Sequence, residues 1–162
     1  MPINAVFGLS ILLSFVAFGL VTRLYLWPWL QHVQRDEALT ALAVPHAFRF
    51  IGLSFLVPGV VSPSLPSAFA IPAAYGDLIA AILAIAAVLA LRARVSWSLA
   101  IVWIFNIWGS VDLLDAMYQG RIGVGIDPGQ MGAAFYIPTV LVPPLLILHG
   151  LIFWLLLRRS RA

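Results

Sequence analysis

The chain has 162 residues, of which 63% are hydrophobic and 9% are charged, whereas an ordinary soluble domain carries about 25% charged residues. It has no cysteine, which excludes disulfides, iron–sulfur clusters, thiolate metal sites and cysteine nucleophiles. Its formal charge of +3 comes from arginines at the ends of apolar segments rather than in a patch, so it does not indicate a nucleic-acid partner. The composition predicts an integral protein of the lipid bilayer, with residues 1–162 forming a single all-α domain.

The N-terminal half predicts two membrane spans. The first runs from about Asn4 to Trp27 and is a retained helix rather than a signal peptide, because no positive charge precedes Arg23. The second runs from about Leu39 to Val60 and contains Pro45, His46 and Arg49. An arginine at a helix centre costs about 2.5–3.5 kcal/mol on insertion, so this span either relies on neighbouring helices or only dips into the membrane. The alternatives are a bundle of five spans and a bundle of four.

The third and fourth spans follow a proline-rich loop. Pro72 suits the first turn of the third span, which reaches Leu91. One face of this span carries small residues at the spacing of close helix packing, namely Gly76, Ala80, Ala84 and Ala87. The fourth span runs from Val95 to about Met117, and the glycine-rich segment Gln119–Gln130 after it is predicted to be a surface turn.

The fifth span, Gly132–Leu157, is interrupted by Pro138 and by the pair Pro143-Pro144. We expect a proline kink near Val142, because residues before proline avoid the α region. The part after Pro144 is too short to cross alone, so both halves are predicted to form one kinked helix.

Arginine also predicts the orientation of the spans. With five spans, seven of the nine arginines fall on one side, which the positive-inside rule makes the cytoplasmic side: Arg23, Arg35, Arg92, Arg94, Arg158, Arg159 and Arg161. We therefore predict a multi-pass protein of the bacterial inner (cytoplasmic) membrane type, with its N-terminus outside and its C-terminus in the cytoplasm.

Several polar residues fall at similar depths inside the predicted spans. Counted from the cytoplasmic helix ends at 1.5 Å per residue, His46 lies about 15 Å deep, Arg49 and Asn106 about 20 Å and Asp77 about 22 Å. Arg49 and Asp77 form the natural ion pair, since an unpaired charge in hydrocarbon is costly. Asp112 and Asp115 are assigned to a solvated rim at the outer interface.

Intramembrane histidines raise a second possibility. His46 and His149 lie at nearly equal depth on different helices and could ligate a b-type haem axially. No other metal site is predicted, and buried histidines with protein partners are the simpler interpretation.

The residues from Arg49 to about Asp112 are similar to the DoxX-like small membrane proteins. The parts that carry the resemblance are Arg49-Phe50-Ile51-Gly52-Leu53, Pro58-Gly59, Pro72 and Gly76-Asp77. The chain departs from that pattern in having Asp77 where the family commonly shows glutamate, and in having an extra span before the matched region. The resemblance implies a four-helix bundle associated with quinone or redox partners.

These observations predict a small membrane protein that binds a lipophilic or quinone-like ligand through His46, Arg49, Asp77 and Asn106. We expect the ligand cavity to open beside these residues and to be lined by aromatics such as Phe50 and Trp103. The alternatives are an enzyme acting on such a ligand, a proton or solute transporter, and an accessory subunit without its own site. A homo-oligomer or a larger membrane complex is compatible with each of them.

Overall fold

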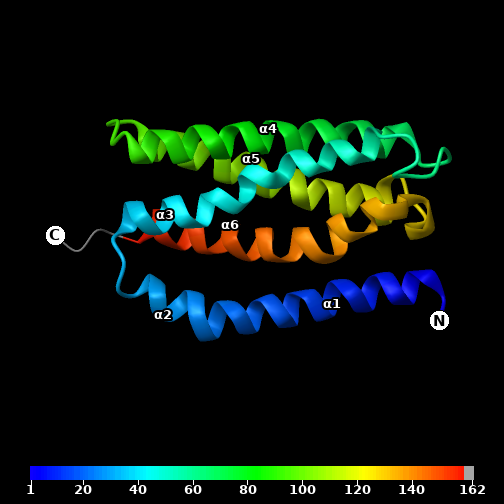
Figure 1. The fold of residues 1–162 in the computed structure, drawn as a ribbon, viewed down its shortest axis with the longest axis horizontal. Helices are drawn as coiled ribbons and strands as arrows, with labels where there is room; N and C mark the ends of the chain where they lie inside the picture. The colour runs from blue at the N-terminus through cyan, green and yellow to red at the C-terminus, as the bar shows by residue number, and fades with distance from the viewer. Residues whose placement is uncertain (159–162) are drawn as a thin grey trace.

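The structure is a computed structural model that describes residues 1–158, and within this range it contains helices and no β-strand. The described chain has five helical segments long and apolar enough to cross a membrane: Ile3–Leu30, Arg35–Leu56, Ser67–Arg92, Ser98–Gly123 and Ile137–Leu157. Successive segments run in opposite directions along one long axis (Figure 1). The predicted all-α bundle with five apolar spans is confirmed.

The first span consists of α1 (Ile3–Val21), a π-helical turn η1 (Thr22–Leu26) and the short α2 (Trp27–Leu30). Pro28 lacks an N–H and cannot continue a regular α-helical ladder. The chain adapts by widening the turn before it, since the N–H of Trp27 donates to the carbonyl of Thr22, five residues back. The span therefore continues past the proline as one long helix.

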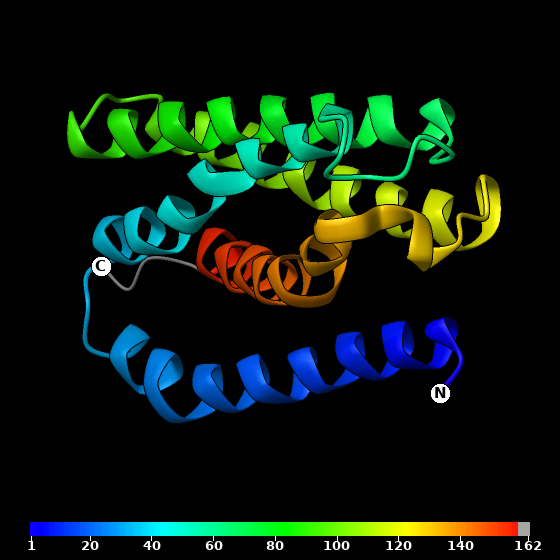
Figure 2. The same cartoon turned by 45° about the vertical axis from the view of Figure 1, so that its right-hand side comes forward.

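Helix α1 forms an outer layer of the bundle. It lies beside α6 and apart from α4 and α5, as the views in Figure 1 and Figure 2 both show. Ser14 is its only buried residue, and most of its leucine and valine side chains are exposed. An apolar helix exposed on most of its surface is suited to contact with lipid.

The second span changes its helical type part-way along. It begins as α3 (Arg35–Ala43) and continues as a 3₁₀-helix, η2 (Val44–Leu56), with Pro45 at its start. Because a 3₁₀-helix has three residues per turn, residues three apart stack in one row, and the buried row here is His46, Arg49, Gly52 and Phe55. At about 1.5 Å per α residue and 2.0 Å per 3₁₀ residue the span is about 40 Å long, so it reaches across the whole bundle rather than dipping in.

Helix α4 (Ser67–Arg92) packs against both η2 and α5 (Ser98–Tyr118). The predicted small-residue face of α4 is confirmed, because all four of its members are buried: Gly76, Ala80, Ala84 and Ala87. The predicted position of Pro72 in the first helical turn was wrong. The helix begins at Ser67, after Pro66, so Pro72 lies inside it.

The segment predicted as a surface turn, Gln119–Gln130, is partly helical. A π-helical turn, η3 (Gln119–Gly123), extends α5, and a 3₁₀ segment, η4 (Pro128–Phe135), follows. Gly132 breaks η4 with φ of +51°, a conformation that favours glycine, and a Cβ there would collide with the carbonyl oxygen of Val60.

The last span is shorter than predicted, because the helix proper starts after Gly132. It comprises a π-helical turn, η5 (Ile137–Leu141), and α6 (Val142–Leu157). Val142 keeps helical dihedrals although it precedes Pro143, and its N–H donates to the carbonyl of Ile137 five residues back. The distortion expected near Val142 therefore takes the form of a widened turn directly before the proline pair.

Three of the arginines that predicted the orientation lie at one end of the bundle, which we call the arginine end. Arg35 begins α3, Arg92 ends α4 and Arg158 follows α6, and these three helix ends lie together (Figure 1). Arg159 and Arg161 lie outside the described residues. The shared end supports the alternation of the spans, while the assignment of this end to the cytoplasm stays a prediction.

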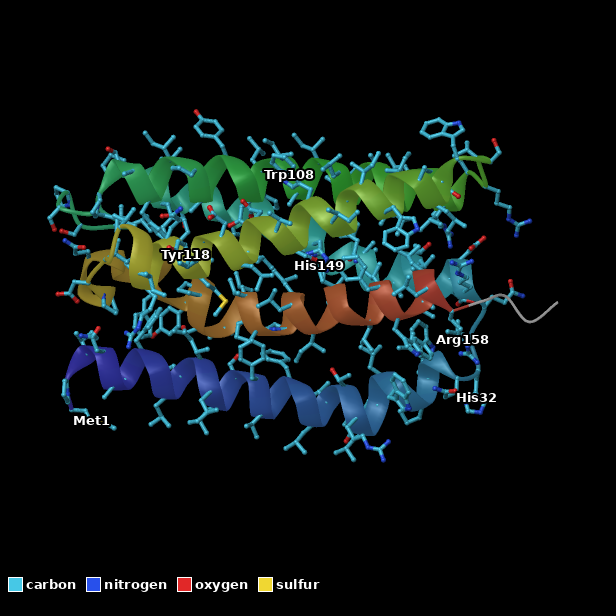
Figure 3. The ribbon with its side chains drawn as sticks, turned by 180° about the vertical axis from the view of Figure 1, so that it is seen from behind. Met1, His32, Trp108, Tyr118, His149 and Arg158 are labelled. Carbon is cyan, nitrogen blue, oxygen red and sulfur yellow. The ribbon has the colours of Figure 1, made fainter. Side chains whose placement is uncertain are left out.

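Two apolar clusters fill the interior, one toward each end. The arginine-end cluster includes Leu39, Leu42, Val102, Phe105 and Ile152. The cluster at the opposite end, which holds the N-terminus and the long loops, includes Phe55, Phe69, Leu113, Met131 and Leu145. Five buried polar residues fall between members of the two clusters along their helices: His46, Arg49, Asp77, Asn106 and His149. Figure 3 accordingly shows His149 midway between the two ends of the bundle.

Candidate functional site

A buried arginine joins three helices at the middle of the bundle. Arg49 on η2 is 3% exposed, and its Nε donates to Asp77 Oδ1 on α4 at 2.7 Å. Its Nη1 donates to the carbonyl of Gly109 on α5 at 3.0 Å, and its Nη2 donates to Asp112 Oδ2. We call Arg49, Asp77 and Asp112 the arginine cluster. Each guanidinium nitrogen thus has an acceptor from a neighbouring helix, so the cluster fixes the register of η2, α4 and α5.

Three glycines make room for these polar side chains. A Cβ on Gly52 of η2 would overlap the side chain of Asp77, and one on Gly76 of α4 would overlap the carboxyl of Asp112. A Cβ on Gly109 of α5 would lie 2.7 Å from His149 Nε2 and 2.8 Å from Arg49 Nη1. At each of these positions the polar group of one helix rests on the bare backbone of another.

A second polar group lies behind Gly109, toward the arginine end. His149 Nδ1 donates to Asn106 Oδ1 at 2.7 Å, because an amide oxygen can only accept, and Asn106 Nδ2 donates to the His149 carbonyl at 3.3 Å. The rings of His46 and His149 are 4.1 Å apart, and Phe105 packs against both. Within residues 1–158, neither ring nitrogen of His46 has a hydrogen-bond partner, nor has His149 Nε2.

The histidine pair does not fit a haem. Two axial ligands lie on opposite faces of a haem plane, whereas the rings of His46 and His149 contact each other directly, with 4.1 Å between their centroids. No macrocycle can lie between them. Among the described residues no group of three or more histidine and acidic side chains is arranged to hold a metal ion either.

Two cavities meet at the arginine cluster. The first, of about 350 Å³, lies between α1, α4 and α5, and Asp77 and Asp112 are its acidic residues; we call it the α5 cavity. The second, of about 450 Å³, lies between α1, η2 and α6, and contains Arg49 and Asp77 in its wall; we call it the η2 cavity. The remaining walls are mainly apolar, with residues such as Phe7, Phe55 and Met131 in the α5 cavity and Phe18, Phe48 and Leu145 in the η2 cavity. Asp77 therefore lines both cavities, beneath the loosely packed α1.

The model of a family described as a domain of unknown function, DUF8737, matches residues 6–157. The chain belongs to this family. No curated protein and no solved structure matches the chain. The matched range of the DUF8737 family runs from α1 to α6, so it includes the helix that covers the cavities as well as the helices that hold the arginine cluster.

The structure brings together the predicted pair and adds a residue. Arg49 and Asp77 form the expected ion pair. The assignment of Asp112 to a solvated rim was wrong, because its carboxylate also pairs with Arg49 and its side chain is only 14% exposed. The spacing on α5 could have identified it, since Asp112 follows Gly109 by three residues and positions three apart are neighbours on a helix surface.

Other predicted site residues lie outside the cavity walls. His46 and Asn106 are fully buried and line neither cavity, because they form the separate group behind Gly109. Phe50 and Trp103, which were expected to line the cavity, do not: Phe50 is 50% exposed on the outside of the bundle, and Trp103 packs against Phe153.

Proposed function

We propose that this membrane protein binds a lipophilic small molecule between α1 and the other helices, with its polar end on the arginine cluster. The observation that carries the proposal is that Asp77 lines two cavities at once. Their volumes of about 350 and 450 Å³ fall within the range of about 300–1,000 Å³ that small-molecule sites occupy. Mainly apolar walls with a few converging polar groups are typical of such sites.

The position of α1 supports access from the bilayer. This helix contributes Phe7 and Phe18 to the cavity walls but buries only Ser14, so little of its surface is covered by the rest of the bundle. A lipophilic molecule could reach the arginine cluster from the membrane interior by passing beside α1. His46 and Asn106, proposed from the sequence as direct contacts, would act only by supporting Arg49 through Gly109 and His149.

The described residues disfavour the transporter alternative. The polar residues end at His46, and the arginine-end cluster beyond them is apolar, with Leu39, Leu42 and Val102 no more than 1% exposed. A transported ion would have to cross this apolar layer. The resemblance to DoxX-like proteins, with the quinone association that it implies, stays a prediction.

The experiment is a search for the bound molecule. The protein is purified in a mild non-ionic detergent, and the small molecules that remain with it are identified by native mass spectrometry. We expect a lipophilic compound to stay bound to the wild-type protein and to be lost from Ala73→Phe, because Ala73 is 7% exposed and lines the α5 cavity. Ala100→Phe makes the same change at an exposed position of α5 that lines neither cavity and serves as the matched control. Equal occupancy in the two variants would refute the proposal.

A further inference from the structure

The charges at the arginine cluster do not balance. Arg49 carries one positive charge, while Asp77 and Asp112 offer two carboxylates, both paired with the same guanidinium. Arg121 also lines the α5 cavity, but it lies on η3 at the bundle end and is exposed to solvent. The deep end of the α5 cavity therefore has one more carboxylate than it has cations, and in a low-dielectric interior an uncompensated charge is costly.

Next to the arginine cluster, the polar surface of the α5 cavity consists of acceptors, whereas Asn4 and Arg121, which also line the cavity, lie on α1 and η3. The side chain of Arg49 is 1% exposed, and its nitrogens are directed at Asp77, Gly109 and Asp112. The two carboxylates are more accessible, at 10% for Asp77 and 14% for Asp112. Each uses one oxygen on Arg49, and the other oxygen has no hydrogen-bond partner among residues 1–158. While both groups are ionised, a ligand head that reaches them must donate hydrogen bonds, because an ionised carboxylate can only accept.

We propose that the α5 cavity selects lipophilic amines, whose protonated head supplies both the missing positive charge and the hydrogen-bond donors. This inference rests on the proposed function and specifies the chemistry of the ligand. An ammonium bound where Asp77 and Asp112 line the α5 cavity would give both carboxylates a cationic partner. An alcohol of the same tail offers a single donor without charge, and a fatty acid offers a third carboxylate, which the cluster repels.

The test compares three probes that share a fourteen-carbon tail: tetradecylamine, tetradecanol and myristate. Binding to the full chain in phosphatidylcholine nanodiscs is measured, and binding to nanodiscs that contain Ala73→Phe is subtracted to remove partitioning into lipid. We expect the amine to bind about tenfold or more tightly than the alcohol, since a charge-assisted hydrogen bond is about twice as strong as a neutral one. We expect myristate to bind most weakly of the three.

Two variants examine the source of the preference. Asp112→Asn removes the surplus charge while Asp77 still pairs with Arg49, so the preference for tetradecylamine over tetradecanol should disappear. Glu37→Gln removes a carboxylate at the exposed start of α3, at the arginine end, and should leave the preference intact.

The outcomes separate this inference from the proposed function. Amine selection would be overturned if the amine and the alcohol bound equally, or if myristate bound more tightly than the amine. If Ala73→Phe still abolished that binding, the proposed site for a lipophilic molecule would be retained. Loss of the amine preference in Glu37→Gln would also overturn amine selection. The same signal for all three probes in wild type and Ala73→Phe would overturn the proposed function itself.

Discussion

Removing both carboxylates of the arginine cluster should destabilise the protein by more than the sum of the two single changes. In Asp77→Asn or Asp112→Asn, the asparagine oxygen can still accept from Arg49 and the other carboxylate still balances its charge. Replacing one charge-assisted hydrogen bond by a neutral one costs about 1 kcal/mol. The double variant leaves a guanidinium that is 1% exposed without any carboxylate, and stranding a buried charge in this way costs about 3–5 kcal/mol. The expected coupling is thus about 1–3 kcal/mol beyond additivity.

The measurement is the free energy of unfolding in mixed micelles of non-ionic detergent and sodium dodecyl sulfate, followed by circular dichroism. Asp115→Asn, which changes an exposed carboxylate on the same helix, should stay within about 0.5 kcal/mol of wild type. Adding Arg49→Gln to the double variant should recover part of the loss, because it removes the stranded charge. If the losses of unfolding free energy in Asp77→Asn and Asp112→Asn simply add in the double variant, the idea that either carboxylate alone can balance Arg49 is refuted.

Three further predictions concern packing, helix ends and topology. Gly76→Ala should lower stability by about 1–3 kcal/mol in the same unfolding assay, since its Cβ would overlap the α5 carboxyl, whereas Gly150→Ala, with nothing within 4 Å, should be neutral or mildly stabilising. Arg35→Ala should cost about 1–2 kcal/mol, because Arg35 donates at 3.0 Å to two carbonyls at the end of α6; an unchanged unfolding midpoint would show that these bonds contribute nothing. A reporter fused after Ala162 should be cytoplasmic and one inserted in the 120–129 loop external, and finding both on one side would contradict the predicted orientation.

The number and order of the spans could be predicted because apolar length is a property of the local sequence. The proline positions were harder to interpret. A kink was expected near Val142, before Pro143, and the structure instead widens the turn there and also the turn before Pro28. A π-helical turn depends on which carbonyl lies within reach, which neighbouring helices determine, so the sequence alone does not encode it.

For the site, the Arg49–Asp77 pair could be predicted from depth, since a rise of 1.5 Å per residue places both near the middle of their helices. The second partner could not be predicted in this way, because a long arginine side chain reaches residues at a different depth. Asp112 was assigned to the outer interface on its distance from the helix start alone, although it neighbours Gly109, three residues earlier, on the helix surface. His46 lies away from Asp77 and Asp112 because it packs against Phe105 and His149. No spacing in the sequence indicates these contacts.

The 3₁₀ geometry of η2 also sets the thickness of membrane that the second span can cross. Its 13 residues extend about 26 Å at 2.0 Å per residue, whereas the same residues in an α-helix would extend about 20 Å. In an α-helix three residues turn through about 300° rather than 360°, so each member of the row His46, Arg49 and Gly52 would be rotated by about 60° from the one before it. The bonds from Arg49 to α4 and α5 therefore oppose any relaxation of η2 to α-helix, which would shorten the span by about 6 Å. A variant that loses these bonds should therefore be most stable in a thinner bilayer than the wild-type protein. The effect of one buried arginine would then be measurable as a shift in the preferred bilayer thickness.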